Sequence, residues 1–101
     1  MREYIYTLKL IPRLYDEQNW TEEDRYVVQE HFVRLEKLCD EGKVILAGKT
    51  DRNDEYGFGI VIFKEESDSK AEAFMKEDPT VKKGLMSTEV SPYRIALLTN
   101  R

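Results

Sequence analysis

The sequence is poor in the residues that build disulfides and metal centres. Its 101 residues include one cysteine, Cys39, and one histidine, His31. A single cysteine excludes an intramolecular disulfide and a cysteine cluster, and one histidine among scattered carboxylates offers none of the usual metal-ligand spacings. We therefore expect the chain to work without a metal.

Long apolar runs and an excess of basic charge are also missing. No apolar segment approaches the ~20 residues that a membrane-spanning helix requires. The 16 Lys and Arg residues are outnumbered by 20 Asp and Glu, and the nearest approach to a basic cluster is Lys82-Lys83. These features argue against nucleic acid and membranes as partners. A strand pattern that follows Met1 directly, with no signal peptide, predicts a cytoplasmic protein.

The composition is that of one globular domain spanning residues 1–101. Hydrophobic residues make up 41% of the chain and charged residues 36%, which is too apolar for a disordered protein. A domain of this size buries only about two thirds or less of its unfolded surface. Association with a second copy would therefore add to its stability.

Hydrophobic periodicity predicts four strands and two helices. The expected strands cover residues 4–10, 44–48, 57–63 and 90–98, and the second and third should pair as a hairpin. The first helix is expected to follow an N-cap at Thr21 and to run to about Glu41, and the second to follow Ser67 or Ser69 and end at Asp78. Residues 11–20 should form a loop that carries aromatic side chains, and Pro92 marks the last strand as an edge or a bulge.

This order, βαββαβ, predicts an α+β, ferredoxin-like fold: a four-stranded antiparallel sheet with two helices on one face. The strands at 44–48 and 57–63 are apolar on both sides, so the helix-free face of a monomer would expose an apolar patch. A second copy related by a two-fold axis would cover that patch. We therefore expect a homodimer joined through the sheet faces.

His31 lies on the apolar side of the first predicted helix. Helical steps from it reach aliphatic residues, while the charged residues Glu30, Arg34 and Glu36 are assigned to the other side. A histidine in this setting is either a hydrogen-bonded core residue or a functional group. Cys39 shares the same side, either as a small buried apolar residue or as a reactive thiol. The aliphatic residues of this side are Val27, Val28, Leu35 and Leu38.

Asp78 is the second candidate. It is expected at the C-terminal end of the second helix, where the helix dipole disfavours a carboxylate by about 0.3–1 kcal/mol, so a compensating partner is expected. A histidine and a carboxylate together form a proton-handling pair, because the carboxylate orients one ring nitrogen and leaves the other free. The alternative is that Asp78, which precedes Pro79, only ends the helix.

The sequence resembles the YCII-related (YciI-like) family of the dimeric α/β-barrel superfamily over nearly its whole length. Two departures are visible. Lys49 stands where the family often has proline, and the connection at 11–20 is longer than the minimal family version. The resemblance is carried by QEHFVRL at 29–35, GKVILAG at 42–48, DPTVKKGL at 78–85 and VSPY at 90–93.

The resemblance implies that His31 and Asp78 line a pocket between helix and sheet and carry out acid–base chemistry, which in related proteins includes elimination from a chlorinated aromatic diol. Asp78 would accept a hydrogen bond from one imidazole N–H, and His31 would act as the base on a small aromatic or enolisable substrate, giving isomerisation or elimination without a cofactor. The competing hypothesis is a non-catalytic module that binds a small molecule in the same pocket.

Four further residues are candidates for substrate binding. Gly48 lacks a side chain and could let a substrate approach its strand, or it could mark a bend. Trp20, Tyr15 and Arg13 could form a lid from the 11–20 segment. Their alternative roles are core packing for the two aromatic residues and a solvated surface charge for Arg13.

Overall fold

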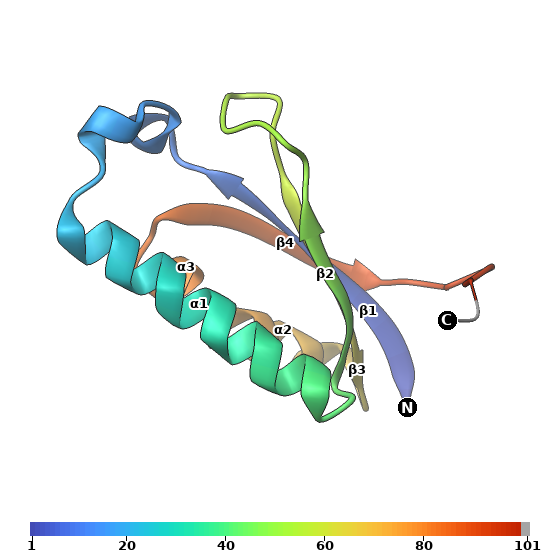
Figure 1. The fold of residues 1–101 in the computed structure, drawn as a ribbon. Coiled ribbons are helices and arrows are strands. Elements are labelled where there is room, and N and C mark those ends of the chain that lie inside the picture. Colours follow the sequence, from blue (N-terminus) through green and yellow to red (C-terminus); the bar gives the residue numbers. More distant parts are fainter. Residues whose placement is uncertain (100–101) are drawn as a thin grey trace.

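The computed structural model describes residues 1–99 and contains one four-stranded antiparallel sheet, in the order β2-β3-β1-β4, with the helices on one face (Figure 1). This confirms the ferredoxin-like α+β fold expected from the order of elements. The strands are β1 (Arg2–Leu10), β2 (Val44–Lys49), β3 (Gly59–Glu65) and β4 (Met86–Pro92). The helices are α1 (Glu22–Asp40), α2 (Asp68–Lys76) and α3 (Pro79–Lys82), and two 3-10 turns, η1 (Pro12–Tyr15) and η2 (Glu17–Asn19), connect β1 to α1.

The core lies between the sheet and the helices. β1 alternates as its sequence predicts: Tyr4, Tyr6 and Leu8 face the helices and are buried. On the neighbouring strand and helix, the rings of Phe63 and Phe74 stack with their centres 4.4 Å apart. Aromatic rings packed in this way make the inner face of the sheet a dry, rigid support for groups that the helices present to it.

The long helix α1 begins and ends at the expected residues. The Thr21 side chain accepts a hydrogen bond from the Asp24 amide, and the Asp24 carboxylate accepts one from the Thr21 amide, which completes the predicted capping box. At the other end, Gly42 has φ of 82°, a left-handed conformation that glycine adopts without strain. The limits of α1 are therefore set by local sequence.

The second helix ends earlier than expected, and this changes the role of Asp78. α2 stops at Lys76, Glu77 is its C-cap, and Asp78 has extended backbone angles because it precedes Pro79. The Asp78 side chain accepts a hydrogen bond from the Thr80 amide and so caps α3 at its N-terminus. The prediction of a carboxylate at a helix C-terminus was wrong, because the chain starts a new helical turn at the proline.

The last strand also differs from its prediction. β4 spans Met86–Pro92, whereas the sequence pattern placed it at 90–98. The apolar residues beyond Pro92 misled the periodicity argument, since Leu97 is 93% exposed and forms no part of the core. Pro92 does end an edge strand, as its missing N–H requires. The 11–20 loop contains the two short 3-10 turns.

The opposite face of the sheet carries no helix (Figure 1). Ile5 pairs with Ile62, which pairs with Leu46. Because side chains of a strand alternate between faces, these three lie on the face of the sheet away from Tyr4 and Tyr6. Leu46 is 41% exposed there. We call this the open face.

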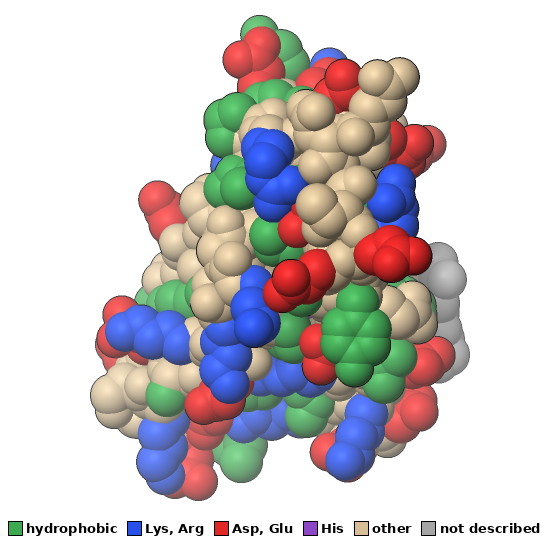
Figure 2. All heavy atoms as spheres, turned by 90° about the vertical axis from the view of Figure 1, so that its left-hand side faces the viewer, with side chains coloured by type: hydrophobic (Ala, Val, Ile, Leu, Met, Phe, Trp, Pro, Cys, Tyr) green, Lys and Arg blue, Asp and Glu red, His purple; other side chains and the backbone are tan. Residues whose placement is uncertain are grey.

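Charge is distributed rather than clustered over the end of the molecule that carries η1 and η2. Figure 2 shows basic and acidic side chains interspersed over that side, with hydrophobic side chains in separate small groups. This agrees with the mixed charge of the sequence. Among residues 1–99, no helix is both long and apolar enough to cross a membrane.

Candidate active site

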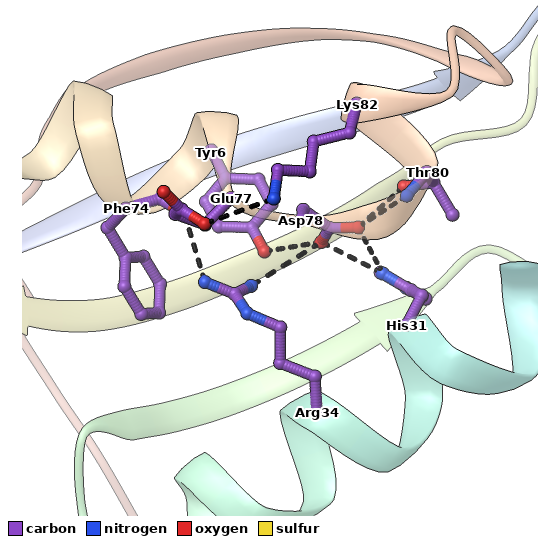
Figure 3. A network of polar contacts seen from close by, with 8 residues as sticks. All are labelled: Tyr6, His31, Arg34, Phe74, Glu77, Asp78, Thr80 and Lys82. Atoms are coloured by element: carbon purple, nitrogen blue, oxygen red, sulfur yellow. Dashed lines mark hydrogen bonds and ion pairs between the residues drawn. The ribbon is translucent and has the colours of Figure 1, made fainter.

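The fold brings His31 of α1 against Asp78 at the start of α3, 47 residues further along the chain (Figure 3). The Nδ1 atom of His31 lies 2.8 Å from both carboxylate oxygens of Asp78. The Asp78 side chain is fully buried, and that of His31 is 14% exposed. The imidazole therefore stands between a buried carboxylate and the surface.

The Asp78 carboxylate is held by donors from three elements. The Tyr6 hydroxyl of β1 donates to Oδ2 at 2.7 Å, and Thr80 donates to Oδ1 from its hydroxyl at 2.7 Å and its amide at 3.0 Å. Burial raises the pKa of Asp78, but the hydrogen bonds from His31, Tyr6 and Thr80 together with the charge of His31 lower it by more than burial raises it. The pKa of Asp78 is therefore below that of an ordinary aspartate. The carboxylate is ionised at neutral pH.

An ionised carboxylate fixes the tautomer of the neutral imidazole. Because Asp78 has no proton to donate, Nδ1 of His31 must be the donor, and Nε2 is left with its lone pair. Burial, and then the charge of Asp78, raise the pKa of Tyr6 well above its ordinary value, so its phenol remains a donor. This arrangement orients a ring nitrogen as a base.

A pocket of about 470 Å³ opens on the other side of His31, between α1, β1 and the hairpin of β2 and β3. Its wall is mostly apolar, with Trp20, Phe32 and Phe58 among its residues. Asp78 does not line it, which corrects the expectation that both members of the pair do. The volume suits a small organic ligand, and His31 is the titratable group that joins the pocket to the buried network.

The structure brings two of the four further candidates to this pocket. Gly48 of β2 and Trp20 both line it, and a methyl group at Gly48 would meet no atom within 4 Å. The indole N–H of Trp20 donates to the Leu14 carbonyl at 2.9 Å, which holds the ring in place. Gly48 contributes backbone to the pocket wall, while by alternation with Leu46 the space found beside it lies on the open face; Trp20 forms a fixed wall.

Tyr15 and Arg13 do not line the pocket. Tyr15 lies at the end of η1 and is 37% exposed. Arg13 makes two bonds to the Asp24 carboxylate, at 2.7 and 3.1 Å, and a third to the Asn19 carbonyl. The hydrogen bonds that Asp24 accepts from Arg13, and then the one from the Thr21 amide, hold the pKa of Asp24 well below its usual range. Arg13 thus ties the loop to the capping box instead of standing free as a lid.

Charged residues occupy parts of the pocket wall. Cys39 also lines the pocket and is exposed, so the interpretation of it as a small buried residue was wrong. No group of three His, Cys, Asp or Glu side chains within residues 1–99 is arranged to hold a metal ion. The charged residues of the wall are Glu36, Asp40, Lys49, Arg52 and Asp54.

Sequence reasoning missed three members of the network: Arg34, Tyr6 and Thr80. Arg34 was assigned to the solvent side of α1, yet it lies one turn after His31 and its Nη1 is 3.9 Å from Asp78 Oδ2. The spacing of three residues on a helix is the signal that could have found it. For Thr80, the signal was its position two residues after an aspartate that caps a helix at proline.

The fold and the site together define a ferredoxin-like domain with a histidine at a pocket beside the sheet and a buried aspartate behind that histidine. The family model of the YCII-related domain matches residues 10–94 of this chain. The chain therefore belongs to the YCII-related family. No curated protein sequence matches it.

One similar solved structure is that of 5-chloro-2-hydroxyhydroquinone dehydrochlorinase (TftG) from Burkholderia phenoliruptrix AC1100, in complex with 2,5-dihydroxybenzoquinone. The two chains share 25% sequence identity and superpose with a TM-score of 0.64. The similarity covers 91% of this chain and 93% of that one. It therefore extends over nearly the whole domain.

Proposed function

We propose that this protein is an enzyme that uses His31 and Asp78 for general acid–base catalysis on a small aromatic or enolisable substrate, without a cofactor. The observation that carries the proposal is the 2.8 Å contact between Nδ1 of His31 and a fully buried carboxylate, on a histidine that lines a largely apolar pocket. Groups arranged in this way are typical of acid–base sites.

In the proposed reaction, Nε2 of His31 removes a proton from a hydroxyl group or an activated carbon of the substrate. For elimination, a leaving group then departs with its bonding electrons, so that the substrate loses the elements of an acid and gains a double bond. For isomerisation, the imidazolium returns the proton to another atom. Asp78 stabilises the imidazolium in both cases, and a transfer of this kind contributes about 10²–10⁴-fold to the rate.

The similar dehydrochlorinase supports elimination as the first reaction to test. Its name describes the removal of hydrogen chloride from a hydroxylated chloroaromatic ring, and its complex holds a dihydroxybenzoquinone. The pocket of the present chain, with its aromatic wall and about 470 Å³ of space, can accept a single ring of that size. Chlorinated hydroquinones are therefore the first substrates to try.

The test begins with thermal stabilisation of the purified protein by phenols, chlorinated hydroquinones, lactones and keto acids, since a ligand that binds only the folded state raises the melting temperature. Each ligand that stabilises the protein is then assayed for conversion and, where it carries chlorine, for chloride release. Turnover supports the proposal. Ligands that bind tightly and are never converted favour the second candidate, a non-catalytic binding module, which the apolar pocket alone would serve.

We also propose that two copies associate through the open face, because Ile5 and Leu46 lie there with no helix to cover them. Light scattering at micromolar concentration should give the mass of a dimer. Leu46→Glu should shift the protein towards monomer, because it would bury a charge in the interface. The matched control is Val33→Glu on α1, on the other side of the sheet, which should remain dimeric. A monomeric wild-type protein would refute this prediction.

A further inference from the structure

The Asp78 carboxylate faces two basic side chains on successive turns of α1. His31 contacts it at 2.8 Å and Arg34 lies 3.9 Å from it, both on the side of the helix that meets α3 (Figure 3). The proposed reaction uses only the first of these residues. Arg34 therefore needs a separate explanation, since its side chain is only 21% exposed and a charge with so little access to solvent is rare unless it is paired.

Arg34 is held in place by contacts outside the His31 and Asp78 pair. Its Nη2 donates to the Phe74 carbonyl at 3.0 Å, and the guanidinium lies over the Phe74 ring, 4.6 Å from its centre. Its Nη1 is buried and has no hydrogen-bond acceptor among residues 1–99. The distance of 3.9 Å to Asp78 Oδ2 exceeds hydrogen-bonding range, so Arg34 acts on Asp78 through its charge.

The protonation state of His31 then follows from the charges that are buried together. With a neutral imidazole, the carboxylate of Asp78 and the guanidinium of Arg34 balance. A proton on His31 leaves one net positive charge in a poorly solvated cluster, which is unfavourable. Without Arg34, the same proton would balance Asp78, so the imidazolium would be more favourable than it is with Arg34 present. An imidazolium cannot accept the substrate's proton.

We infer that Arg34 is a positioning residue that acts through Asp78 and disfavours the imidazolium form of His31, and so favours the neutral form that can accept a proton. The inference rests on the proposed function for its catalytic consequence. Its physical content, the dependence of the His31 titration on the charge at position 34, does not require that a substrate be known.

Other groups near the pair change this charge balance little. The Tyr6 phenol and Thr80 are neutral, and Glu77 pairs with Lys82 at 3.3 Å. Lys43, whose Nζ lies 5.2 Å from the centre of the Phe74 ring, pairs with Glu65. On the pocket side, Arg52 pairs with Asp54, and solvent screens the exposed charges. The remaining titratable residues of the pocket wall are Glu36, Cys39, Asp40 and Lys49.

The test is an NMR pH titration of the only histidine, in the wild type and in variants of position 34. Arg34→Gln should raise the titration midpoint of His31 by about one pH unit, because it removes a positive charge that opposes the imidazolium. Arg34→Lys retains the charge and should stay close to the wild type. Asp78→Asn should move the midpoint in the opposite direction, towards lower pH.

The matched control is Lys37→Gln, which removes one positive charge from the exposed side of the same helix. Amide spectra check that each variant is folded. If Arg34→Gln is not folded, Arg34→Met replaces it in the titration, because the methionine side chain can still cover Phe74. A midpoint in Arg34→Gln that moves no more than in Lys37→Gln would overturn the inference. So would an Arg34→Lys midpoint equal to that of Arg34→Gln, since charge would then not be the cause.

Turnover supplies a second measurement if a substrate is found. In Arg34→Gln, the acid limb of the kcat/KM profile should move to higher pH by the same amount as the NMR midpoint, with activity recovered at alkaline pH. A purely structural role would instead lower the whole profile. The titration and the turnover assay fail separately: absence of turnover refutes the proposed function, while an unchanged titration refutes the role of Arg34.

Discussion

Replacement of Asp78 by alanine is expected to lower the free energy of unfolding by about 3–5 kcal/mol at neutral pH, the range for removing one partner of a buried ion pair. The substitution would leave the Tyr6 hydroxyl and the Thr80 hydroxyl without their acceptor, and the guanidinium of Arg34 without its counter-charge. It would also remove the N-cap of α3. Urea denaturation at a fixed protein concentration measures the loss.

Asp51→Ala is the matched control, because Asp51 is exposed in the turn between β2 and β3. Its effect should stay within about 0.5 kcal/mol, as is usual for surface positions. A loss of less than about 1 kcal/mol in Asp78→Ala would contradict the prediction. It would mean that the bonds drawn to Asp78 in Figure 3 stabilise the folded state no better than water does.

The effect of Asp78→Ala should also depend on pH in a defined direction. The pKa of Asp78 is lower in the folded protein than in an unfolded chain, so its stabilising contribution is complete above the unfolded value of ~3.9. That contribution is lost as the pH falls through the lower, folded-state pKa. The difference in stability between wild type and variant should therefore become smaller below about pH 4, as Asp78 takes up a proton.

His31→Ala is expected to lower turnover of any substrate by at least about 100-fold, the lower end for loss of a general base. The folded state should persist, because the imidazole is at the edge of the network and 14% exposed, while Tyr6 and Thr80 still hold Asp78. The comparison is made through kcat and kcat/KM at a pH on the plateau of the wild-type profile. Lys37→Gln serves as the control with full activity.

Partial recovery of His31→Ala by added imidazole would show that the missing base, and not a distorted pocket, causes the loss. An active His31→Ala protein would reduce the histidine to a packing residue. In that case the pocket would remain as a binding site, and the candidate function would be the non-catalytic module. The two outcomes separate catalysis from binding without knowledge of the natural substrate.

Local sequence was sufficient for most of the elements. The alternation of Tyr4, Tyr6 and Leu8 predicts the inner face of β1 because side chains of a strand point to alternate faces. Thr21, Asp24 and Gly42 predict the ends of α1 because capping depends on a few neighbouring backbone groups. Both predictions are confirmed, and the physical causes act within a few residues.

Predictions failed where two local signals competed. The local sequence fits Asp78 equally well as the end of one helix and as the N-cap of the next. Asp78 is the N-cap because the ring of Pro79 fits the first position of a helix. The apolar residues after Pro92 have the pattern of a strand, yet the ladder with β1 ends at the Tyr4–Pro92 pair, followed only by a hydrogen bond from the Tyr93 amide to the Glu3 carbonyl at 3.0 Å. Burial, which periodicity assumes, is decided by neighbours that lie far away in the sequence.

The fold class, the family and a histidine on the inner side of a long helix can all be predicted from the residues alone, because they depend on periodicity, capping and short motifs. The position of Asp78 behind His31, outside the pocket, and the contacts of Arg34 and Tyr6 with its carboxylate emerge only when the chain is folded. The reason is that these groups come from α1, β1 and α3, and their separation is set by sheet register and helix packing. Both are properties of the whole chain that no short segment encodes.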